Sequence, residues 1–154
     1  MRSEQSVTIW YDDLVPGRVF DLGTTVVDRD EMRDFARRYD PQWYHLDEPR
    51  AAASEFGGLI ASGWLTAALF MRLYAEAVLA TADAHTSPGV EELRWLAAVY
   101  AGDVLRGRLE VLDRAPSTAR PGKGTVTLLG ELHRDSVPVL RCRFRGWFGM
   151  RDAQ

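Results

Sequence analysis

The stretch WLTAALFMRLYAEAVLA, residues 64–80, decides the fold of this chain. When it is wound as a helix, it is apolar nearly all the way round. Two charged residues, Arg72 and Glu76, interrupt it, whereas a membrane span needs about 20 mostly apolar residues with few charges. We therefore predict a buried helix, Trp64–Ala80, that the rest of the chain wraps on most sides, and we expect no membrane partner.

The second half of the chain contains four segments in which apolar residues alternate with polar or small ones. A period of two residues is typical of strands with one buried face. The alternating residues that we expect to face inward are Leu93, Trp95, Ala97 and Val99, then Leu105, Leu109 and Val111, then Val126, Leu128 and Leu132, and finally Leu140, Cys142, Phe144 and Phe148. Turn signals at residues 101–103, 117–124 and 135–136 separate the four segments.

An antiparallel meander of these strands, curled around the long apolar helix, is the arrangement that we predict. This is an α+β hotdog fold, in which a curved sheet holds one central helix. The periodicity by itself is also compatible with another α+β sandwich. The chain has 154 residues, which suits one domain, so we expect residues 1–154 to form a single domain.

Composition and charge exclude several classes of function. The net charge is −3 and the basic residues are not gathered in one run, so nucleic acid is not expected as a partner. A single cysteine, Cys142, allows no intrachain disulfide, which fits a reducing compartment. The first residues, MRSEQSVTIWYDDL, lack the apolar stretch of a secretory signal. We expect a cytoplasmic location.

The run YDPQWYHLD, residues 39–47, is the first of two motifs that carry chemistry. The segment before it reads as a helix, because Asp28 and Glu31 have the spacing of a capping box and apolar residues then recur on one face. Pro41 disfavours a helical conformation at the residue before it. We therefore predict a helix over residues 28–39, followed by a loop that bears the acid and the histidine of the motif.

Asp40 and His45 are the candidate acid/base pair of this loop. Asp40 follows the C-terminal end of the predicted helix, where the macrodipole disfavours a negative charge. If the loop also removes Asp40 from water, we expect its pKa to rise toward the range useful for proton transfer. Histidine side chains ordinarily titrate at about pH 6.5, which suits a proton shuttle. We expect a water molecule between the two side chains to lose one proton as it attacks, while a second proton is delivered to the adjacent carbon.

The second motif is FGGLIASGW, residues 56–64, directly before the apolar helix. Gly63 has no side chain where that helix begins, so a ligand could approach the backbone N–H groups there. Free N–H groups at a helix N-terminus stabilise developing negative charge, such as an enolate oxygen of a thioester. Ser62 and Trp64 flank this position, and we include them with Gly63 among the oxyanion and substrate-binding residues.

The two motifs together resemble those of the MaoC-like dehydratases and their (R)-specific enoyl-CoA hydratase relatives. The chain carries the pattern D-x4-H-x-D and then F-G-x-x-I-A-x-G before an apolar helix, and the later run GVEELRWLAAVYAGD also fits. The resemblance covers nearly the whole chain. It implies reversible syn hydration of a trans-2-enoyl thioester, with Asp40 and His45 acting on water and the Gly63 N–H as oxyanion donor. It also implies CoA or an acyl-carrier thioester as the substrate carrier, no metal or redox cofactor, and a homodimer that joins two sheets.

Three positions depart from the hydratase pattern. Gln42 replaces an asparagine, Trp43 replaces a proline, and Met71 lies about where the hydratases have a serine. We place Gln42 and Trp43 among the substrate-binding residues, and we expect the indole of Trp43 to narrow the site. Asp47, the last residue of the first motif, is expected to cap or brace the loop of His45.

Two other functions remain compatible with the sequence. A hotdog thioesterase commonly uses an acid on the central helix, where this chain offers only Glu76. A non-catalytic acyl-binding hotdog protein is the second alternative. The remaining histidines and the cysteine have structural interpretations: His85 as a solvated loop residue, His133 as an outward strand residue and Cys142 as a core residue. The arginines at 141, 143 and 145 form a solvent-facing stripe, a surface for CoA phosphates or a dimer contact. No metal-ligand spacing is present.

Overall fold

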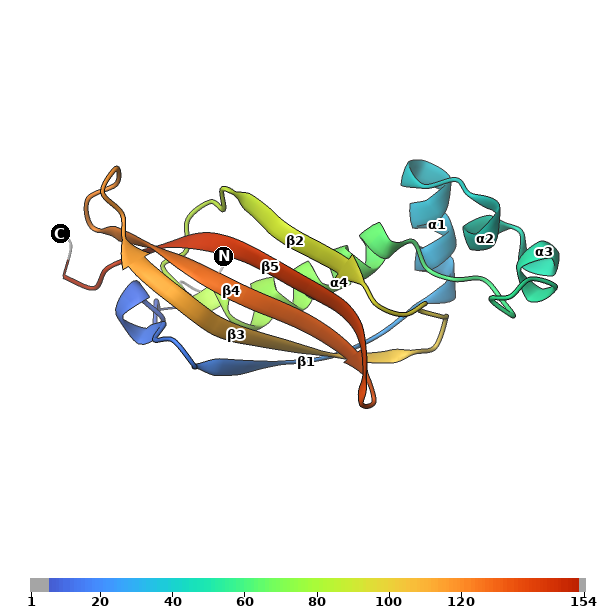
Figure 1. The fold of residues 1–154 in the computed structure, drawn as a ribbon, viewed down its shortest axis with the longest axis horizontal. Helices are drawn as coiled ribbons and strands as arrows, with labels where there is room; N and C mark the ends of the chain where they lie inside the picture. Colours follow the sequence, from blue (N-terminus) through green and yellow to red (C-terminus); the bar gives the residue numbers. More distant parts are fainter. Residues whose placement is uncertain (1–5, 153–154) are drawn as a thin grey trace.

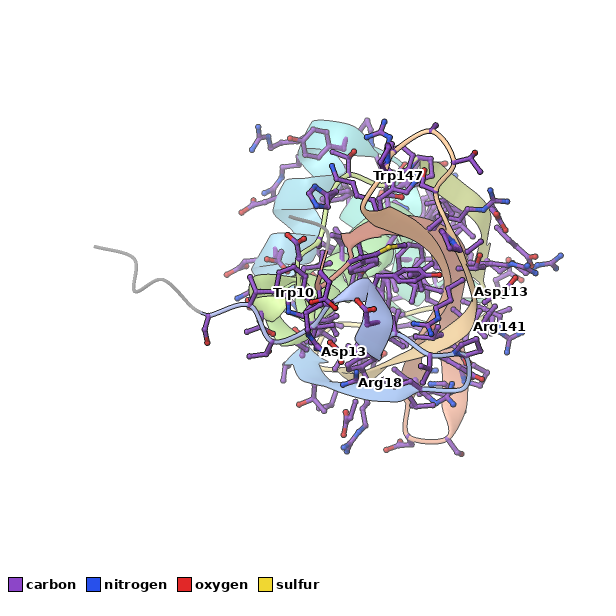
Figure 2. The ribbon with its side chains drawn as sticks, turned by 90° about the vertical axis from the view of Figure 1, so that its left-hand side faces the viewer. Trp10, Asp13, Arg18, Asp113, Arg141 and Trp147 are labelled. Atoms are coloured by element: carbon purple, nitrogen blue, oxygen red, sulfur yellow. The ribbon has the colours of Figure 1, made fainter. Side chains whose placement is uncertain are left out.

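The apolar segment forms α4 (Gly63–Ala77), which begins one residue before the predicted start. In the computed structural model, which describes residues 6–152, α4 lies lengthwise along one face of a single sheet (Figure 1). Seen from the end, the strands curve around it (Figure 2). A short 3-10 helix, η2 (Leu79–Thr81), follows α4.

The sheet has five antiparallel strands, β1 (Val19–Val26), β2 (Gly89–Trp95), β3 (Val104–Pro116), β4 (Lys123–Arg134) and β5 (Val137–Gly149). Their order across the sheet is β1-β3-β4-β5-β2. A curved antiparallel sheet around one central helix is the predicted α+β hotdog fold. The prediction of the fold class is therefore confirmed.

The strand predictions need two corrections. The first strand, β1, was not predicted, because Leu22 is its only buried residue and Gly23 interrupts its register. The second strand, β2, leaves the predicted meander: it pairs with β5 at the far edge of the sheet and ends at Trp95, so that Ala97 and Val99 follow it in a loop. The other three strands, β3 to β5, do form a meander.

The core lies between α4 and the concave face of the sheet. The ten residues predicted to face inward from the last three strands are all buried, and α4 adds Leu65, Leu69, Phe70, Leu73 and Tyr74. The opposite face of α4 is not wrapped, which corrects the expectation of a helix covered on most sides: Trp64 is 59% exposed and Met71 is 48% exposed. The segment Gly63–Thr81 is long and apolar enough to span a membrane, but its position against the sheet is that of a core helix.

Four further helices complete the described part of the chain. The first, η1 (Tyr11–Asp13), lies near the N-terminus. The predicted helix is α1 (Arg29–Tyr39), whose N-cap Asp28 accepts a hydrogen bond from the Glu31 N–H at 2.8 Å. The other two are α2 (Trp43–Leu46) and α3 (Glu48–Ala52). Figure 1 shows α1, α2 and α3 together beyond one end of the sheet, where α4 begins, so both sequence motifs meet at that end.

Candidate active site

The structure brings Asp40 and His45 into direct contact. Asp40 is the C-cap residue of α1, and His45 lies in α2, one short turn later. The Nε2 atom of His45 lies 3.1 Å from Oδ2 of Asp40. The imidazole is buried, while the carboxylate retains some exposure. Because the two side chains touch, the expectation of a water between them is corrected: a reacting water would lie beside the pair.

The other ring nitrogen of His45 is held by the second motif. Its Nδ1 lies 2.7 Å from the carbonyl oxygen of Ile60, which can only accept a hydrogen bond, so Nδ1 carries a hydrogen. The N–H of Ile60 in turn donates to the carbonyl of Tyr44 at 3.1 Å. With Nδ1 occupied, Nε2 faces Asp40. One proton is then shared between Nε2 and the carboxylate, because two bare acceptors would repel each other at this distance.

The carboxylate of Asp40 has two further donors. The Ser62 hydroxyl donates to Oδ2 at 2.7 Å, and the Gln42 side-chain N–H donates to Oδ1 at 2.6 Å. The Tyr44 hydroxyl donates to the side-chain oxygen of Gln42, which orients that amide. Ser62 and Gln42 thus hold the acid in place. For Ser62, this differs from the expected role at the substrate.

These contacts overturn the expected direction of the pKa of Asp40. Partial burial pushes the pKa upward, but the hydrogen bonds from Ser62 and Gln42 and the nearby imidazole outweigh it, so that the pKa lies below the ordinary value of 3.8. The sequence indicated the effect of the helix end, whereas the Ser62 hydroxyl comes from a loop 22 residues away and the Gln42 amide from two residues further along the chain. The ionised form of Asp40 is therefore the form that the site stabilises.

We predict that Ser62→Ala raises the pKa of Asp40, because the variant removes a charge-assisted hydrogen bond and leaves the burial in place. A folded pKa below the unfolded one stabilises the protein above the unfolded value, and this contribution is lost as the pH falls through the folded pKa. The substitution should therefore also reduce the stability gained between acidic and neutral pH. A carboxyl-carbon NMR titration of Asp40 measures the shift directly. Ser54→Ala, at a serine that bonds to Ala51, is the control, and an unchanged titration of Asp40 in Ser62→Ala would contradict the assignment.

The pair opens into a cavity of about 470 Å³ at the N-terminal end of α4. Gln42, Tyr44 and Phe56 line one side of it, and Trp95 with the following residues 96–99 lines the other. Gly63 and Trp64 contribute the start of the helix. A substrate in this cavity would therefore contact the acid/base pair and the helix N-terminus together.

The start of α4 offers a hydrogen-bond donor, but the space around Gly63 is narrower than expected. The N–H of Gly63 has no acceptor among residues 6–152, and the side chain of the N-cap residue Ser62 makes no capping bond because it is used by Asp40. The indole of Trp95 covers Gly63: its N–H donates to the Gly63 carbonyl at 2.6 Å, and a Cβ at position 63 would lie 2.5 Å from the ring. The packing of Trp95 thus requires glycine at position 63, whereas the expected approach of a ligand stays a prediction.

Two other predicted residues lie outside the cavity wall. The indole of Trp43 packs against Phe56 and under the guanidinium of Arg50, which corrects the expectation that it narrows the site. Asp47 caps α3 by accepting a hydrogen bond from the Arg50 N–H at 3.1 Å and does not touch the pair. The local sequence could not reveal that these two side chains point away from the cavity, because both residues lie within the same short motif as His45.

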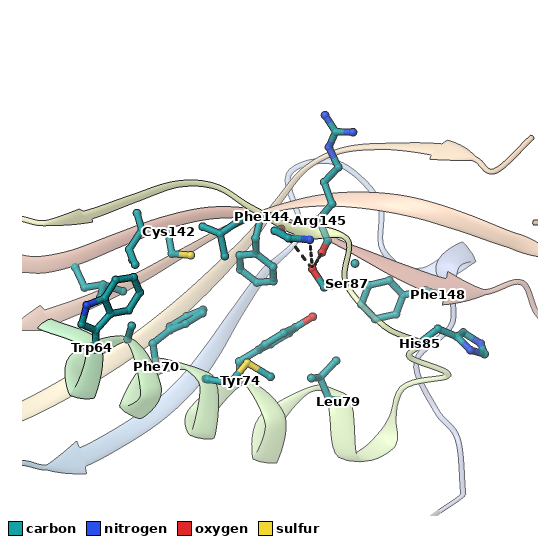
Figure 3. A pocket seen from close by; sticks show the side chains of 17 residues that line it. Trp64, Phe70, Tyr74, Leu79, His85, Ser87, Cys142, Phe144, Arg145 and Phe148 are labelled. Atoms are coloured by element: carbon teal, nitrogen blue, oxygen red, sulfur yellow. Dashed lines mark hydrogen bonds between the residues drawn. The ribbon is translucent and has the colours of Figure 1, made fainter. Parts of the chain in front are cut away.

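Met71 and Trp64 border a second cavity, of about 430 Å³, between α4 and the strands β2 and β5 (Figure 3). Trp64 lines both cavities, so they adjoin along the helix.

Within the described part of the chain, no group of three or more His, Cys, Asp or Glu side chains is placed to bind a metal ion. The expectation of metal-free chemistry stays a prediction.

The structure also shows the surroundings of the candidate residues on β5. Cys142 is buried, as expected of a core residue, and burial raises the pKa of its thiol. The arginines of β5 are paired with acids rather than free for phosphates: Arg141 with Glu131, and Arg143 and Arg145 with Glu91. Sequence reasoning missed Tyr44 and Trp95 as parts of the site. The available signal for Tyr44 was its place inside the first motif. No sequence signal indicated that Trp95, on β2, would contact Gly63.

Comparison with known proteins shows similarity over most of the chain. Residues 13–131 match the family model described as "MaoC like domain". An uncharacterized protein of Bacillus subtilis, YdeM, is 33% identical over 128 residues, which cover 83% of this chain and 90% of that protein. The crystal structure of the MaoC-like dehydratase from Rhodospirillum rubrum is 35% identical with a TM-score of 0.85, covering 94% of this chain and 99% of that chain. R-hydratase PhaJ1 from Pseudomonas aeruginosa, in its unliganded form, is 25% identical with a TM-score of 0.73, covering 93% and 87%.

Proposed function

The chain belongs to the MaoC-like domain family, a hydratase/dehydratase family, and we propose that it is a hydro-lyase that adds water reversibly to a trans-2-enoyl thioester. The contact between Asp40 and His45, beside the free N–H of Gly63 in one cavity, is the observation that carries the proposal. A CoA or acyl-carrier thioester is the proposed substrate, and the cytoplasm is the proposed location.

The proposed reaction begins with a water molecule beside the pair. As the water oxygen bonds to C3 of the enoyl group, Asp40 takes one proton from it, and the electrons of the double bond shift toward the thioester oxygen. The Gly63 N–H and the helix N-terminus stabilise the resulting enolate. The proton held at Nε2 of His45 then passes to C2, and the thioester carbonyl re-forms.

The same two residues restore the starting state. After addition, Asp40 carries the proton from water and Nε2 of His45 has lost one. Transfer across their 3.1 Å contact returns the proton to Nε2. The hydrogen bond from Nδ1 to Ile60 keeps the ring oriented throughout. The steps are one addition and several proton transfers, so the proposal needs no cofactor besides the thioester's own carrier.

A panel of enoyl-CoAs tests the proposed function. Hydration removes the absorbance of the conjugated double bond and leaves the thioester intact, whereas a thioesterase releases free thiol. We expect the absorbance to fall without thiol release. Thiol release on the same substrates would replace the proposal with the thioesterase, and neither signal on any chain length would favour the non-catalytic acyl-binding protein.

The thioesterase has little structural support. Its candidate acid, Glu76, lies near the C-terminal end of α4 with 65% of its side chain exposed, and it pairs with Arg72 at 3.1 Å. It lines neither the cavity of the acid/base pair nor the apolar cavity beside it.

We further propose that the protein is a homodimer joined along β2. This edge strand pairs only with β5 within residues 6–152, and it leaves Val90 and Trp95 exposed beside the uncovered Trp64 and Met71 of α4. Open strand edges and a contiguous apolar surface are typical of an interface.

Analytical ultracentrifugation at micromolar concentration should therefore give a dimer. Val90→Lys should weaken it, because a charge would enter the apolar contact, while Val26→Lys on the opposite edge strand should not. A monomeric wild-type protein, or equal effects of the two lysines, would contradict this arrangement.

A further inference from the structure

The cavity between α4 and the strands β2 and β5 has a role that the acid/base chemistry does not account for. Its wall is almost entirely apolar, with Phe70 and Met71 from α4, Leu93 from β2, and Phe144 and Phe148 from β5. It begins at Trp64, where the cavity of the acid/base pair ends. An acyl chain whose thioester lies at Gly63 can therefore continue along α4 into this cavity.

Tyr74 places a polar group inside that apolar wall. The residue is only 4% exposed, yet its hydroxyl forms no hydrogen bond with any residue from 6 to 152 (Figure 3). Among the fully enclosed side-chain polar atoms of the described residues, only Nε of Arg33 lacks a partner, so the Tyr74 oxygen keeps access to the cavity. Figure 3 shows the hydroxyl directed away from α4, across the cavity toward Ser87 and Phe148.

The neighbouring polar groups are already occupied. The Ser87 hydroxyl donates to the carbonyl of Arg145 and accepts from the Gly89 N–H at 3.2 Å. The guanidinium of Arg145 points away from the cavity in Figure 3 and pairs with Glu91. His85 lies at the rim, 3.7 Å from Asp83. The cavity thus presents the hydroxyl of Tyr74 to a ligand without a free cation to accompany it.

We infer that this cavity receives the distal part of the acyl group and that Tyr74 hydrogen-bonds an uncharged oxygen on it, a hydroxyl or a carbonyl. The inference rests on the proposed function for the placement of the thioester. A plain acyl chain in the cavity would leave this hydroxyl without a hydrogen-bond partner, which is costly, and an oxygen on the chain removes that cost. A carboxylate is a poor fit, because no free cation offsets its desolvation. Burial raises the pKa of Tyr74, so its phenol stays protonated and can donate.

The oxygen in question is remote from the reacting carbons. Gly63 and Tyr74 are eleven residues apart on one helix, which corresponds to roughly 16 Å along its axis at about 1.5 Å per residue. The Tyr74 hydroxyl therefore cannot contact the thioester carbonyl at Gly63 or the hydroxyl formed at C3. It would select substrates that already carry a second oxygen function toward the end of a medium-length or long chain.

Binding of saturated acyl-CoAs tests this selection separately from catalysis, because they have no double bond to hydrate. Isothermal titration would compare hexanoyl- to tetradecanoyl-CoA with their counterparts that carry a hydroxyl, or a keto group, on one of the last carbons. For at least one length, we expect the wild-type protein to bind the oxygenated ligand about three- to tenfold more tightly than the plain one, the usual worth of one hydrogen bond.

The variant Tyr74→Phe removes only the oxygen and should abolish this preference, so that oxygenated and plain acyl-CoAs of the same length bind equally tightly. Tyr11→Phe, at a buried tyrosine that lines neither cavity, should retain the preference. No preference at any length, or a preference that survives in Tyr74→Phe, would overturn the inference. The proposed function is judged separately, by the turnover of enoyl-CoAs by the wild-type protein.

Discussion

Asp40→Asn is expected to reduce turnover of an enoyl thioester by about 10²–10⁴-fold, the usual contribution of a general acid or base. Asparagine keeps the shape and can still bond to Ser62, but it cannot take a proton from water. His45→Gln should cause a loss of the same order, because the ring at Nε2 supplies the second proton. Steady-state kinetics on one enoyl-CoA, with circular dichroism to confirm folding, measures both effects.

The double variant decides whether the two residues act as one unit. The effects of groups that share one step are not additive. The double variant Asp40→Asn/His45→Gln should therefore lose little more activity than the less active of the two single variants. Asp47→Asn and His133→Gln are matched controls, since Asp47 caps α3 and His133 lies on β4, and both should retain activity. A folded Asp40→Asn protein with near-wild-type turnover would refute the assignment of the acid/base pair.

Removing the N–H of Gly63 is expected to have the second-largest effect. Proline is tolerated at the first residue of a helix, and the backbone of Ser62, at φ −56° and ψ 135°, suits a residue before proline. A Cβ at position 63 would collide with Trp95, so both test proteins carry Trp95→Ala to relieve the contact. In that background, Gly63→Pro should turn over about 10²–10³-fold more slowly than Gly63→Ala, the usual cost of losing one oxyanion donor.

The alanine protein is the control in this pair, because it adds the same Cβ and keeps the N–H. The comparison therefore isolates the hydrogen-bond donor from the change in shape. A smaller difference in KM than in kcat is expected, since the charge develops only during the reaction. Equal turnover of the two proteins would mean that another group stabilises the enolate.

The sequence predicted the central helix, three of the strands and the pairing of the two motifs for a physical reason. These features depend on local periodicity and on short spacings. A long apolar helix must pack at least one face against the rest of the chain, and strict alternation in β3, β4 and β5 specifies which side chains face it. The strand β1 was not predicted because it buries little. The strand β2 was predicted with the wrong bounds and the wrong place in the sheet, because an edge strand is not obliged to alternate.

The chain by itself therefore determined the fold class and the candidate residues Asp40, His45 and Gly63. Their chemical state was decided only by tertiary contacts. The Ser62 hydroxyl lowers the pKa of Asp40, and the Ile60 carbonyl orients His45. The indole of Trp95 packs against Gly63 from a strand 32 residues away. Burial and hydrogen bonding depend on which segments meet in space. Local periodicity carries no information on which segments come into contact, which is why the sequence could name Asp40 as a candidate acid and still predict the direction of its pKa wrongly.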